Sequence, residues 1–481
     1  MHSDPEHRLV AAFAAHARAP LDPAALLDIC HALIGVQRDE HMLAWAEKGL
    51  ALAPGHAGFV HARARALRLL GEHARARALR LLGEHARAAQ TWIDAAQTRW
   101  APLFYEARLG RDLYLSGETH QAIAVLERAV HSPLPDDQPD KLRARKWLAE
   151  AMLSLGDARG FMHWLYRNQG DSGNFRHADV PMWNGQRDLR GERVLVTHQM
   201  GYGDQFMLYG ALRHWRDAGA EIMVTCDAAI HSVLEASLPD CRVVAARRPL
   251  TVAVPIEAAL LPDVHDFAPT QQATLLHLPL LTAHDTARPD PYFPAYIRAP
   301  ESARENGAIW GEAMRAQHRG KRLVGLFWDC AQRHAQTLRS KERNWARLRS
   351  MPLDALERLT MNPALGERVQ FVSLLHPDVE MHGGTPRGHV SHYAPAIRTF
   401  ADTTACIEQL DAVVSVDAGV ANLAAMAGKP TAVLVNPTGE WRWGKDGAHS
   451  PWIRDAHVLR QQTMGDWSNV IAATLDWLGQ R

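Results

Sequence analysis

Two stretches of the chain repeat at a distance of 34 residues, and this period constrains the fold more than any other sequence feature. Gly83-Glu84-His85 is followed 34 residues later by Gly117-Glu118-Thr119. At the same offset, a small, a bulky and a small residue recur at helical spacing, as two closely packed antiparallel helices require. The matched positions are Ala88 with Ala122, Trp92 with Leu126, and Ala95 with Ala129. The period therefore predicts a stack of helical hairpins.

The region around this repeat is helical in composition over residues 20–167. Ala, Leu and Arg dominate it, and runs of β-branched residues are almost absent. A period of 34 residues is that of tetratricopeptide repeats. We therefore predict a tetratricopeptide-like domain over residues 20–167. Two roles remain open for it: a concave surface that binds a protein partner, or a support for the domain that follows.

Twelve residues of this region occur twice in succession. The segment RARALRLLGEHA fills Arg63–Ala74 and recurs without change as Arg75–Ala86. Met42 lies 46 residues before its counterpart Ala88, and subtraction of the 12 restores the period of 34. We interpret the second copy as an in-frame insertion. Since 12 helical residues rotate a face by about 120°, the copy cannot extend the same apolar stripe.

Composition and charge exclude several classes of partner. The 53 Lys and Arg residues balance 53 Asp and Glu residues, so nucleic acid is not an expected partner. The five cysteines include no C-x-x-C pair, which favours free thiols and a cytoplasmic protein. The 27 histidines lack metal-ligand spacing, so we expect neither a metal site nor a cofactor. The apolar run Leu9–Ala15 is too short for a membrane span, and we expect an amphipathic helix there and no transmembrane segment elsewhere.

A polar, turn-rich linker at residues 168–190 separates the helical region from a different pattern. After it, short continuous apolar runs alternate with helical segments, which indicates parallel sheets covered on both faces. Two sets of such runs predict two Rossmann-like lobes, at residues 191–300 and 301–481. The expected strands are Val194–Thr197, Ile222–Thr225, Val243–Ala245 and Leu275–Leu278, then Leu323–Phe327, Val369–Leu374, Ala412–Ser415 and Thr431–Val435.

Three segments follow expected strands at the ends where such folds bind ligands. Gly201-Tyr202-Gly203-Asp204 makes a tight turn, in which Asp204 either acts chemically or caps the next helix. Asp417-Ala418-Gly419 opens a helix whose N–H groups suit a diphosphate, with a capping role for Asp417 as the alternative. A basic loop follows Leu323–Phe327, and it is either a solvated face or a means of neutralising a leaving diphosphate. Its basic residues are Arg333, Arg339, Lys341, Arg343, Arg347 and Arg349.

The second half of the chain resembles inverting GT-B glycosyltransferases related to the heptosyltransferases, glycosyltransferase family 9. Proteins that join tetratricopeptide repeats to such a module are the most similar in organisation. Six segments in the family's order carry this resemblance over about residues 190–480. They are VLVTHQMGYGDQFMLYGAL from 194, TLLHLPLL from 274, LVGLFW from 323, LRSMPLDAL from 348, FADTTACIEQLDAVVSVDAGVANLAAMAGKP from 400 and EWRWGKDGAHSPWIRDAHVLRQ from 440.

The resemblance implies metal-independent, inverting transfer from a nucleotide-sugar donor to a protein, lipid-linked or polysaccharide acceptor. It implies that Asp204 is the general base in an acceptor lobe. It implies a donor lobe in which Arg349, Asp417 and Gly419 hold the diphosphate, with Asn422 where the family usually has His. Arg349 is favoured over Arg339 because Met-Pro-Leu follows Ser350.

Two further interpretations complete the expectations from sequence. The tryptophans at 441, 443 and 452 are expected to be core packing rather than cleft lining. A non-catalytic adaptor, in which the module survives as a degenerate sugar-nucleotide binder, is the alternative to an enzyme. The intact Gly-Asp and Asp-x-Gly elements favour the enzyme, whereas Asn422 and the duplicated helical segment favour the adaptor.

Overall fold

The computed structural model of the chain describes residues 5–35, 39–69, 102–133, 135–166, 175–185, 188–247, 254–281, 293–330, 346–376, 384–392 and 397–480. Within it the chain forms two compact units. The first is Met1–Ala151 with Thr337–Asn344 and Thr463–Gly465, and the second is Met152–Gln336, Trp345–Gln462 and Asp466–Arg481.

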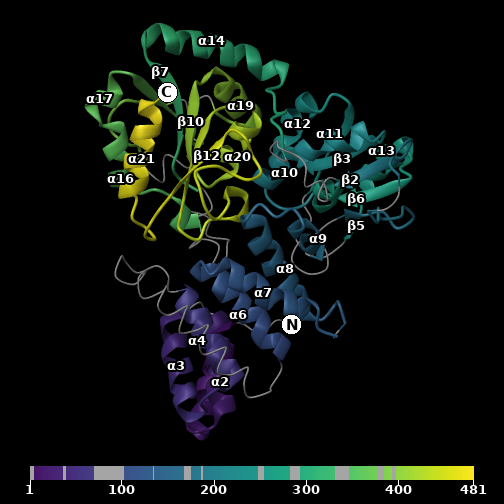
Figure 1. Ribbon diagram of the computed structural model, residues 1–481, viewed down its shortest axis with the longest axis vertical. Helices are drawn as coiled ribbons and strands as arrows, with labels where there is room; N and C mark the ends of the chain where they lie inside the picture. Colours follow the sequence, from purple (N-terminus) through teal and green to yellow (C-terminus); the bar gives the residue numbers. More distant parts are fainter. Residues whose placement is uncertain are drawn as a thin grey trace. The chain divides into compact units, whose positions relative to one another are not determined.

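The described residues of the first unit form helices joined by turns (Figure 1). Its first helix, α1, confirms the amphipathic helix expected near the N-terminus, because Leu9 and Ala12 are buried while Val10 is exposed. Among the described residues, no helix has both the length and the apolar content that crossing a membrane requires. The helices are α1 (Pro5–Arg18), α2 (Pro23–Gly35), α3 (Asp39–Leu52), α4 (Ala57–Leu69), α6 (Pro102–Ser116), α7 (Thr119–Val130) and α8 (Pro139–Ser154).

Small residues let these helices pair closely, as the repeat pattern predicts. A Cβ atom on Gly49 of α3 would lie 2.3 Å from the Phe59 ring of α4. In the same way, a Cβ atom on Gly110 of α6 would lie 2.3 Å from Leu126 of α7. Leu126 and the repeat-matched Ala122 are fully buried. Ala129, the third matched position, is fully buried as well. The upstream counterparts Ala88, Trp92 and Ala95, and the duplicated segment from residue 70 onward, lie outside the described residues.

The second unit contains a four-stranded parallel sheet with the strand order β4-β3-β2-β6, which we call the first sheet. Apolar residues fill it on both faces, since four of the five residues of β2 are buried. Its strands are β2 (Arg193–Thr197), β3 (Glu221–Asp227), β4 (Cys241–Ala246) and β6 (Gln271–Thr274). Helices α10 (Tyr202–Leu208), α11 (Leu212–Asp217), α12 (His231–Ser237) and α13 (Leu261–Phe267) surround it (Figure 1).

The second sheet has six parallel strands in the order β12-β11-β10-β7-β8-β9. Every residue of β8, β10 and β11 is buried, which requires helices on both faces. Its strands are β7 (Arg322–Phe327), β8 (Val369–Ser373), β9 (Val390–His392), β10 (Ala412–Val416), β11 (Thr431–Val435) and β12 (Ala456–Arg460). The accompanying helices are α14 (Glu301–Gln317), α16 (Leu353–Thr360), α17 (Pro363–Gly366), α19 (Phe400–Gln409), α20 (Gly419–Met426) and α21 (Ser468–Gly479) (Figure 1).

One expected strand is wrong. The run from Leu275 is a 3-10 helix, Leu275–Leu281, and the strand precedes it as Gln271–Thr274. The prediction was wrong because the buried leucines of this run lie in a helix and not in a strand. Pro279, within the same helix, has no N–H to donate to a neighbouring strand. The polar strand is stabilised by its neighbours: the Gln272 side chain donates to the carbonyl oxygen of His177 at 2.8 Å. A separate two-stranded parallel pair joins β1 (Phe175–Arg176) and β5 (Val254–Pro255).

The second unit includes the end of α8 and a short helix α9 (Gly160–Trp164). The Phe161 ring lies 5.1 Å from Trp452, and the Trp164 ring lies 4.9 Å from Trp441, measured between ring centroids. The indole nitrogen of Trp452 also donates to the carbonyl oxygen of Leu153 at 3.0 Å. These rings form one buried aromatic cluster, so α9 is packed against the α/β unit through its side chains.

Candidate active site

The site residues follow the strands at which each sheet reverses its order. In the first sheet, β3 and β4 lie on one side of β2 and β6 lies on the other. In the second sheet, β8 and β9 lie on one side of β7, whereas β10, β11 and β12 lie on the other. The loops that leave β2, β7 and β10 therefore start at two topological switch points, where open parallel sheets bind ligands. These loops lead to Asp204, Arg349 and Asp417 respectively.

The turn after β2 stores backbone strain next to Asp204. Met200 has φ = 68°, in the left-handed region that non-glycine residues seldom adopt. Gly201 then begins α10 with φ = −80°, and its N–H donates to Oδ2 of Asp204 at 3.1 Å. Asp204 thus caps its own helix, and its side chain is largely buried. Strain of this kind often marks a functional position.

The second glycine of the turn is needed for close approach. A Cβ atom on Gly203 would lie 2.8 Å from Nδ2 of Asn422 and 3.3 Å from Cα of Gly419. Gly419 in turn has room for an ordinary contact, since its Cβ would lie 3.7 Å from the Gly203 nitrogen. The start of α10 and the start of α20 are therefore in contact. The turn that follows β2 therefore lies against the start of α20, the helix start for which the sequence predicts phosphate binding.

Asp417 does not cap α20, because Ala418 occupies the N-cap position and no side chain bonds there. Instead, Oδ1 of Asp417 accepts a hydrogen bond of 2.7 Å from the indole nitrogen of Trp443. Its Oδ2 lies 3.8 Å from Nη1 of Arg349. Burial raises the pKa of the Asp417 carboxyl above its ordinary value, and Glu440 adds to this while Arg349 opposes it. The carboxylate is thus part of a buried ionic group.

Arg349 is the cation of this group. Its Nη1 donates to the backbone oxygen of Asp417 at 3.1 Å, and 15% of its side chain is exposed. Burial acts to lower the pKa of Arg349, but the surrounding anions, led by Asp417, raise it above its ordinary value. The next residue, Ser350, is tied to the end of β7, because its hydroxyl accepts from the N–H of Cys330 at 2.9 Å. The Arg-Ser element therefore lies beside the Asp-x-Gly turn, as the resemblance implies.

A residue that sequence reasoning missed joins Asp204 to this group. Arg442 forms ion pairs with Asp204 through Nη2 and with Glu440 through Nη1. Burial acts to lower the pKa of Arg442, but Asp204 and Glu440 raise it above its ordinary value. The signal in the sequence was the Trp-Arg-Trp block, which we interpreted as packing. That interpretation is confirmed for its tryptophans, since Trp441 and Trp443 are buried, as is Trp452.

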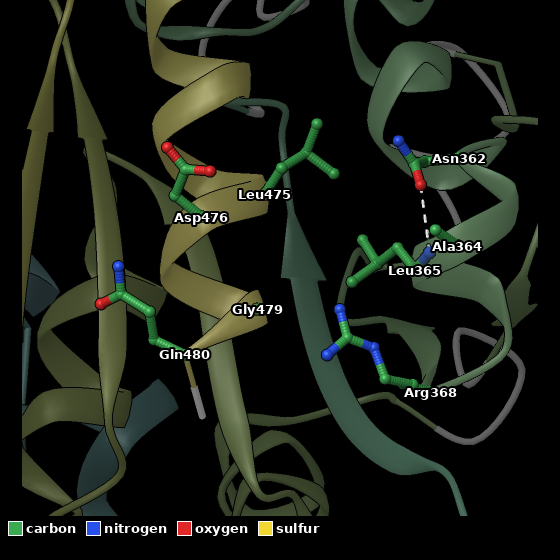
Figure 2. Close-up of a pocket in the computed structure, with 8 residues that line it drawn as sticks. All are labelled: Asn362, Ala364, Leu365, Arg368, Leu475, Asp476, Gly479 and Gln480. Atoms are coloured by element: carbon green, nitrogen blue, oxygen red, sulfur yellow. Dashed lines mark hydrogen bonds between the residues drawn. The ribbon is translucent and has the colours of Figure 1, made fainter.

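Other candidate features lie outside this group. Arg333, Arg339, Lys341 and Arg343 fall outside the described residues, so the structure does not compare Arg339 with Arg349. Within the described ranges, His, Cys, Asp and Glu side chains form no cluster of three or more that could hold a metal. Figure 2 shows an open pocket between α17 and α21, lined by none of the expected site residues. Its lining is Asn362, Ala364, Leu365, Arg368, Leu475, Asp476, Gly479 and Gln480.

Comparison with known proteins gives similarity only at the level of solved structures. No protein-family model matches the chain. No curated protein matches it either. A glycosyl transferase family 9 protein from Veillonella parvula is 13% identical, with a TM-score of 0.39 over 58% of this chain and 88% of that chain. The ADP-heptose heptosyltransferase II of E. coli is 14% identical, with a TM-score of 0.38 over 60% and 99% of the two chains.

A third solved structure is similar to about a third of the chain. It is a tetratricopeptide-repeat protein from Thermus thermophilus, which is 24% identical with a TM-score of 0.29 over 34% of this chain and 80% of that chain. The similar structures thus belong to the two classes that the sequence resembles.

Proposed function

We propose that the chain is an inverting glycosyltransferase that moves a sugar from a nucleotide-sugar donor to an acceptor hydroxyl. The main support for the proposal is that the loops which start at the switch points of the two sheets lie against each other. A carboxylate from the first sheet, Asp204, faces an ionic group from the second sheet that contains Arg349 and the start of α20. Sugar transfer from a nucleotide diphosphate needs a base on one side and stabilisation of anionic charge on the other.

On the donor side, Arg349 and the start of α20 would bind the diphosphate. Asp417 is engaged by Trp443 and Arg349, so its role in the proposal is to orient Arg349, and it does not touch phosphate. Gly419 keeps the helix start open to close approach, with N–H groups that favour an anion. Because these groups supply the positive charge, the proposed reaction does not require a metal ion.

Asn422 would take a different part of the donor. Its Nδ2 donates to the Ala418 carbonyl oxygen at 3.3 Å, which fixes the orientation of the amide. Its Oδ1 is buried and has no hydrogen-bond partner among the described residues. An acceptor oxygen repels phosphate oxygens but accepts from hydroxyls. We therefore assign Asn422 to a hydroxyl of the donor, on its sugar or its ribose.

On the acceptor side, Asp204 would accept the proton of the attacking hydroxyl. Attack from that side, with the diphosphate leaving on the opposite side, inverts the anomeric carbon. The proposal assigns residues 191–300 to an acceptor lobe and residues 301–481 to a donor lobe of a GT-B module. Residues 20–167 would be the repeats, available for a protein partner, with residues 168–190 as the linker. The acceptor would be a protein, a lipid-linked glycan or a polysaccharide in the cytoplasm.

The test is nucleotide release from a panel of UDP-, GDP- and ADP-sugars, with transfer to water as the default reaction. We expect one donor to be consumed, EDTA to leave the rate unchanged, and the released sugar to have the inverted anomeric configuration by NMR. Retained configuration would contradict the assigned role of Asp204 as the base of an in-line attack. Tight binding of a nucleotide sugar without release, even with acceptor extracts, would establish the non-catalytic adaptor instead.

A further inference from the structure

The Asp204 carboxylate is held from both sides by different parts of the unit. Its Oδ2 accepts from the Gly201 N–H at 3.1 Å, within the turn that carries Asp204. Its Oδ1 is ion-paired with Arg442, which lies 238 positions later in the chain and belongs to the second sheet's side. Each oxygen retains a further lone pair, because an ionised carboxylate accepts about four hydrogen bonds. The two bonds therefore fix where the remaining lone pairs point.

Arg442 is itself held by three further contacts. Its guanidinium carbon lies 5.0 Å from the centroid of the Trp441 ring, in a cation–π contact. Its Nη1 is ion-paired with Glu440. Its backbone oxygen accepts from the Ser450 hydroxyl at 2.6 Å, and 7% of the residue is exposed. A guanidinium held this firmly presents a preorganised fork to its carboxylate partner.

We infer that Arg442 is a positioning residue that orients the Asp204 carboxylate for proton transfer. This inference rests on the proposed function. Because Arg442 and Asp204 come from opposite lobes, the base is held by two bonds only when the lobes are together. With the lobes apart, Asp204 keeps a single bond to its own turn. The arrangement makes the orientation of the base conditional on closure of the two lobes around the substrates, and so links closure to chemistry.

Arg442 is poorly placed to be a phosphate ligand. Its two terminal nitrogens are engaged by Asp204 and Glu440, and a diphosphate would have to displace a buried carboxylate to reach it. Arg349 differs, because its salt bridge with Asp417 is longer, at 3.8 Å, and 15% of its side chain is exposed. Loss of Arg442 should therefore reduce kcat and leave donor binding intact, whereas loss of Arg349 should reduce donor binding.

The test compares Arg442→Lys and Arg442→Met with wild type, using the UDP-, GDP- or ADP-sugar that wild type consumes fastest. Lysine keeps the charge but has one point of contact instead of a fork. We expect kcat to fall about 10-fold in Arg442→Lys and about 50-fold or more in Arg442→Met. The dissociation constant of the free nucleoside diphosphate, measured by titration calorimetry, should stay within about twofold of wild type.

Arg460→Lys is the matched control. Arg460 supports the same segment, donating to the Gly444 carbonyl oxygen at 2.7 Å and to the Trp443 carbonyl oxygen at 3.4 Å. Its kcat should stay close to wild type, even if its melting temperature falls. Weaker nucleotide binding at an unchanged kcat in Arg442→Lys would overturn the inference and make Arg442 a phosphate ligand. Equal loss of kcat in the two lysine variants would reduce Arg442 to a structural role.

The failure of this inference is distinguishable from failure of the proposed function. If wild type releases nucleotide and Asp204→Asn does not, the proposed function stands whatever Arg442 does. Under those conditions, an unchanged kcat in the folded Arg442→Lys variant would refute the positioning role of Arg442 but not the proposed function. If Arg442→Met is insoluble, the lysine variant still decides the question, because it leaves no unpaired charge in the site.

Discussion

The indole nitrogen of Trp443 donates a 2.7 Å hydrogen bond to a carboxylate oxygen of Asp417. Both side chains are buried, so this bond is made where an unpaired charge would be costly. It holds the Asp417 carboxylate in place, and that carboxylate in turn lies beside Arg349. A tryptophan that the sequence identifies only as core packing is thus also connected to the proposed phosphate ligand.

The first prediction removes this bond. Trp443→Phe keeps an aromatic ring but leaves the buried Asp417 oxygen without its donor. We expect the free energy of unfolding to fall by about 2 kcal/mol from the lost hydrogen bond and ring volume. Nucleoside diphosphate binding should weaken several-fold, because Arg349 loses its ordered neighbour. Denaturant unfolding and calorimetry measure the two effects, and Trp477→Phe serves as the control, since that buried indole lies on α21 and stacks on the His457 ring.

The second prediction distinguishes two roles of the Asp204 carboxylate, that of a general base and that of a helix cap. Asparagine can still accept from the Gly201 N–H but loses the ion pair with Arg442. We expect a lower melting temperature, unchanged nucleotide affinity, and transfer reduced by about 100-fold or more. Asp402→Asn is the matched control, because Asp402 caps α19 in the same way by accepting from the Thr399 N–H at 2.9 Å. Near-normal transfer in folded Asp204→Asn would place the base elsewhere.

The third prediction concerns the diphosphate. Arg349→Ala removes the buried cation beside Asp417, and we expect nucleoside diphosphate affinity to fall by about 2 kcal/mol, or roughly 30-fold. Arg347→Ala, two residues earlier and exposed, should change it by less than about twofold. Arg339→Ala should also have a much smaller effect than Arg349→Ala. Comparable losses at Arg349 and Arg339 would refute the assignment of the Arg-Ser element.

The fourth prediction tests the contact between the starts of α10 and α20. In Gly203→Ala the new methyl group would lie 2.8 Å from Nδ2 of Asn422 and 3.3 Å from the Gly419 backbone, so the Asn422 amide must shift and the Gly419 backbone must give by a few tenths of an ångström. We expect nucleotide affinity to fall about 10-fold and the protein to lose about 1–3 kcal/mol of stability. Gly201→Ala offers the comparison within one turn, because its nearest neighbour would be 3.4 Å away and its φ is −80°. If Gly203→Ala binds as well as Gly201→Ala, the close approach is not needed.

Much of the α/β architecture is predictable because a buried parallel strand appears in the sequence as a short continuous apolar run. Thr431–Val435 coincides with its strand, and the strands near Val194 and Ala412 differ by one residue at an end. The strands β9 and β12 were not foreseen. Val390–His392 has only three residues, and none of them is fully buried, so no continuous apolar run marks it.

The candidate site was predictable in part. Asp204, Arg349, Asp417, Gly419 and Asn422 were found from their places after strands and from family resemblance, and the structure brings them to one region. Their roles remain predictions. Arg442 could not be found in this way, because its partner is 238 residues away and nothing in the local pattern encodes a pairing at that distance.

The packing of α9 against the aromatic cluster determines where the chain can be truncated without exposing its core. A fragment beginning at the polar linker, near residue 168, would lack Phe161 and Trp164 and would uncover the faces of Trp441 and Trp452. The loss would reach the segment that carries Arg442 and Trp443, which immediately follows Trp441. The smallest fragment that keeps the proposed active site intact is therefore expected to start before Met152, and fusion or exchange of the helices that precede it is best engineered upstream of that residue.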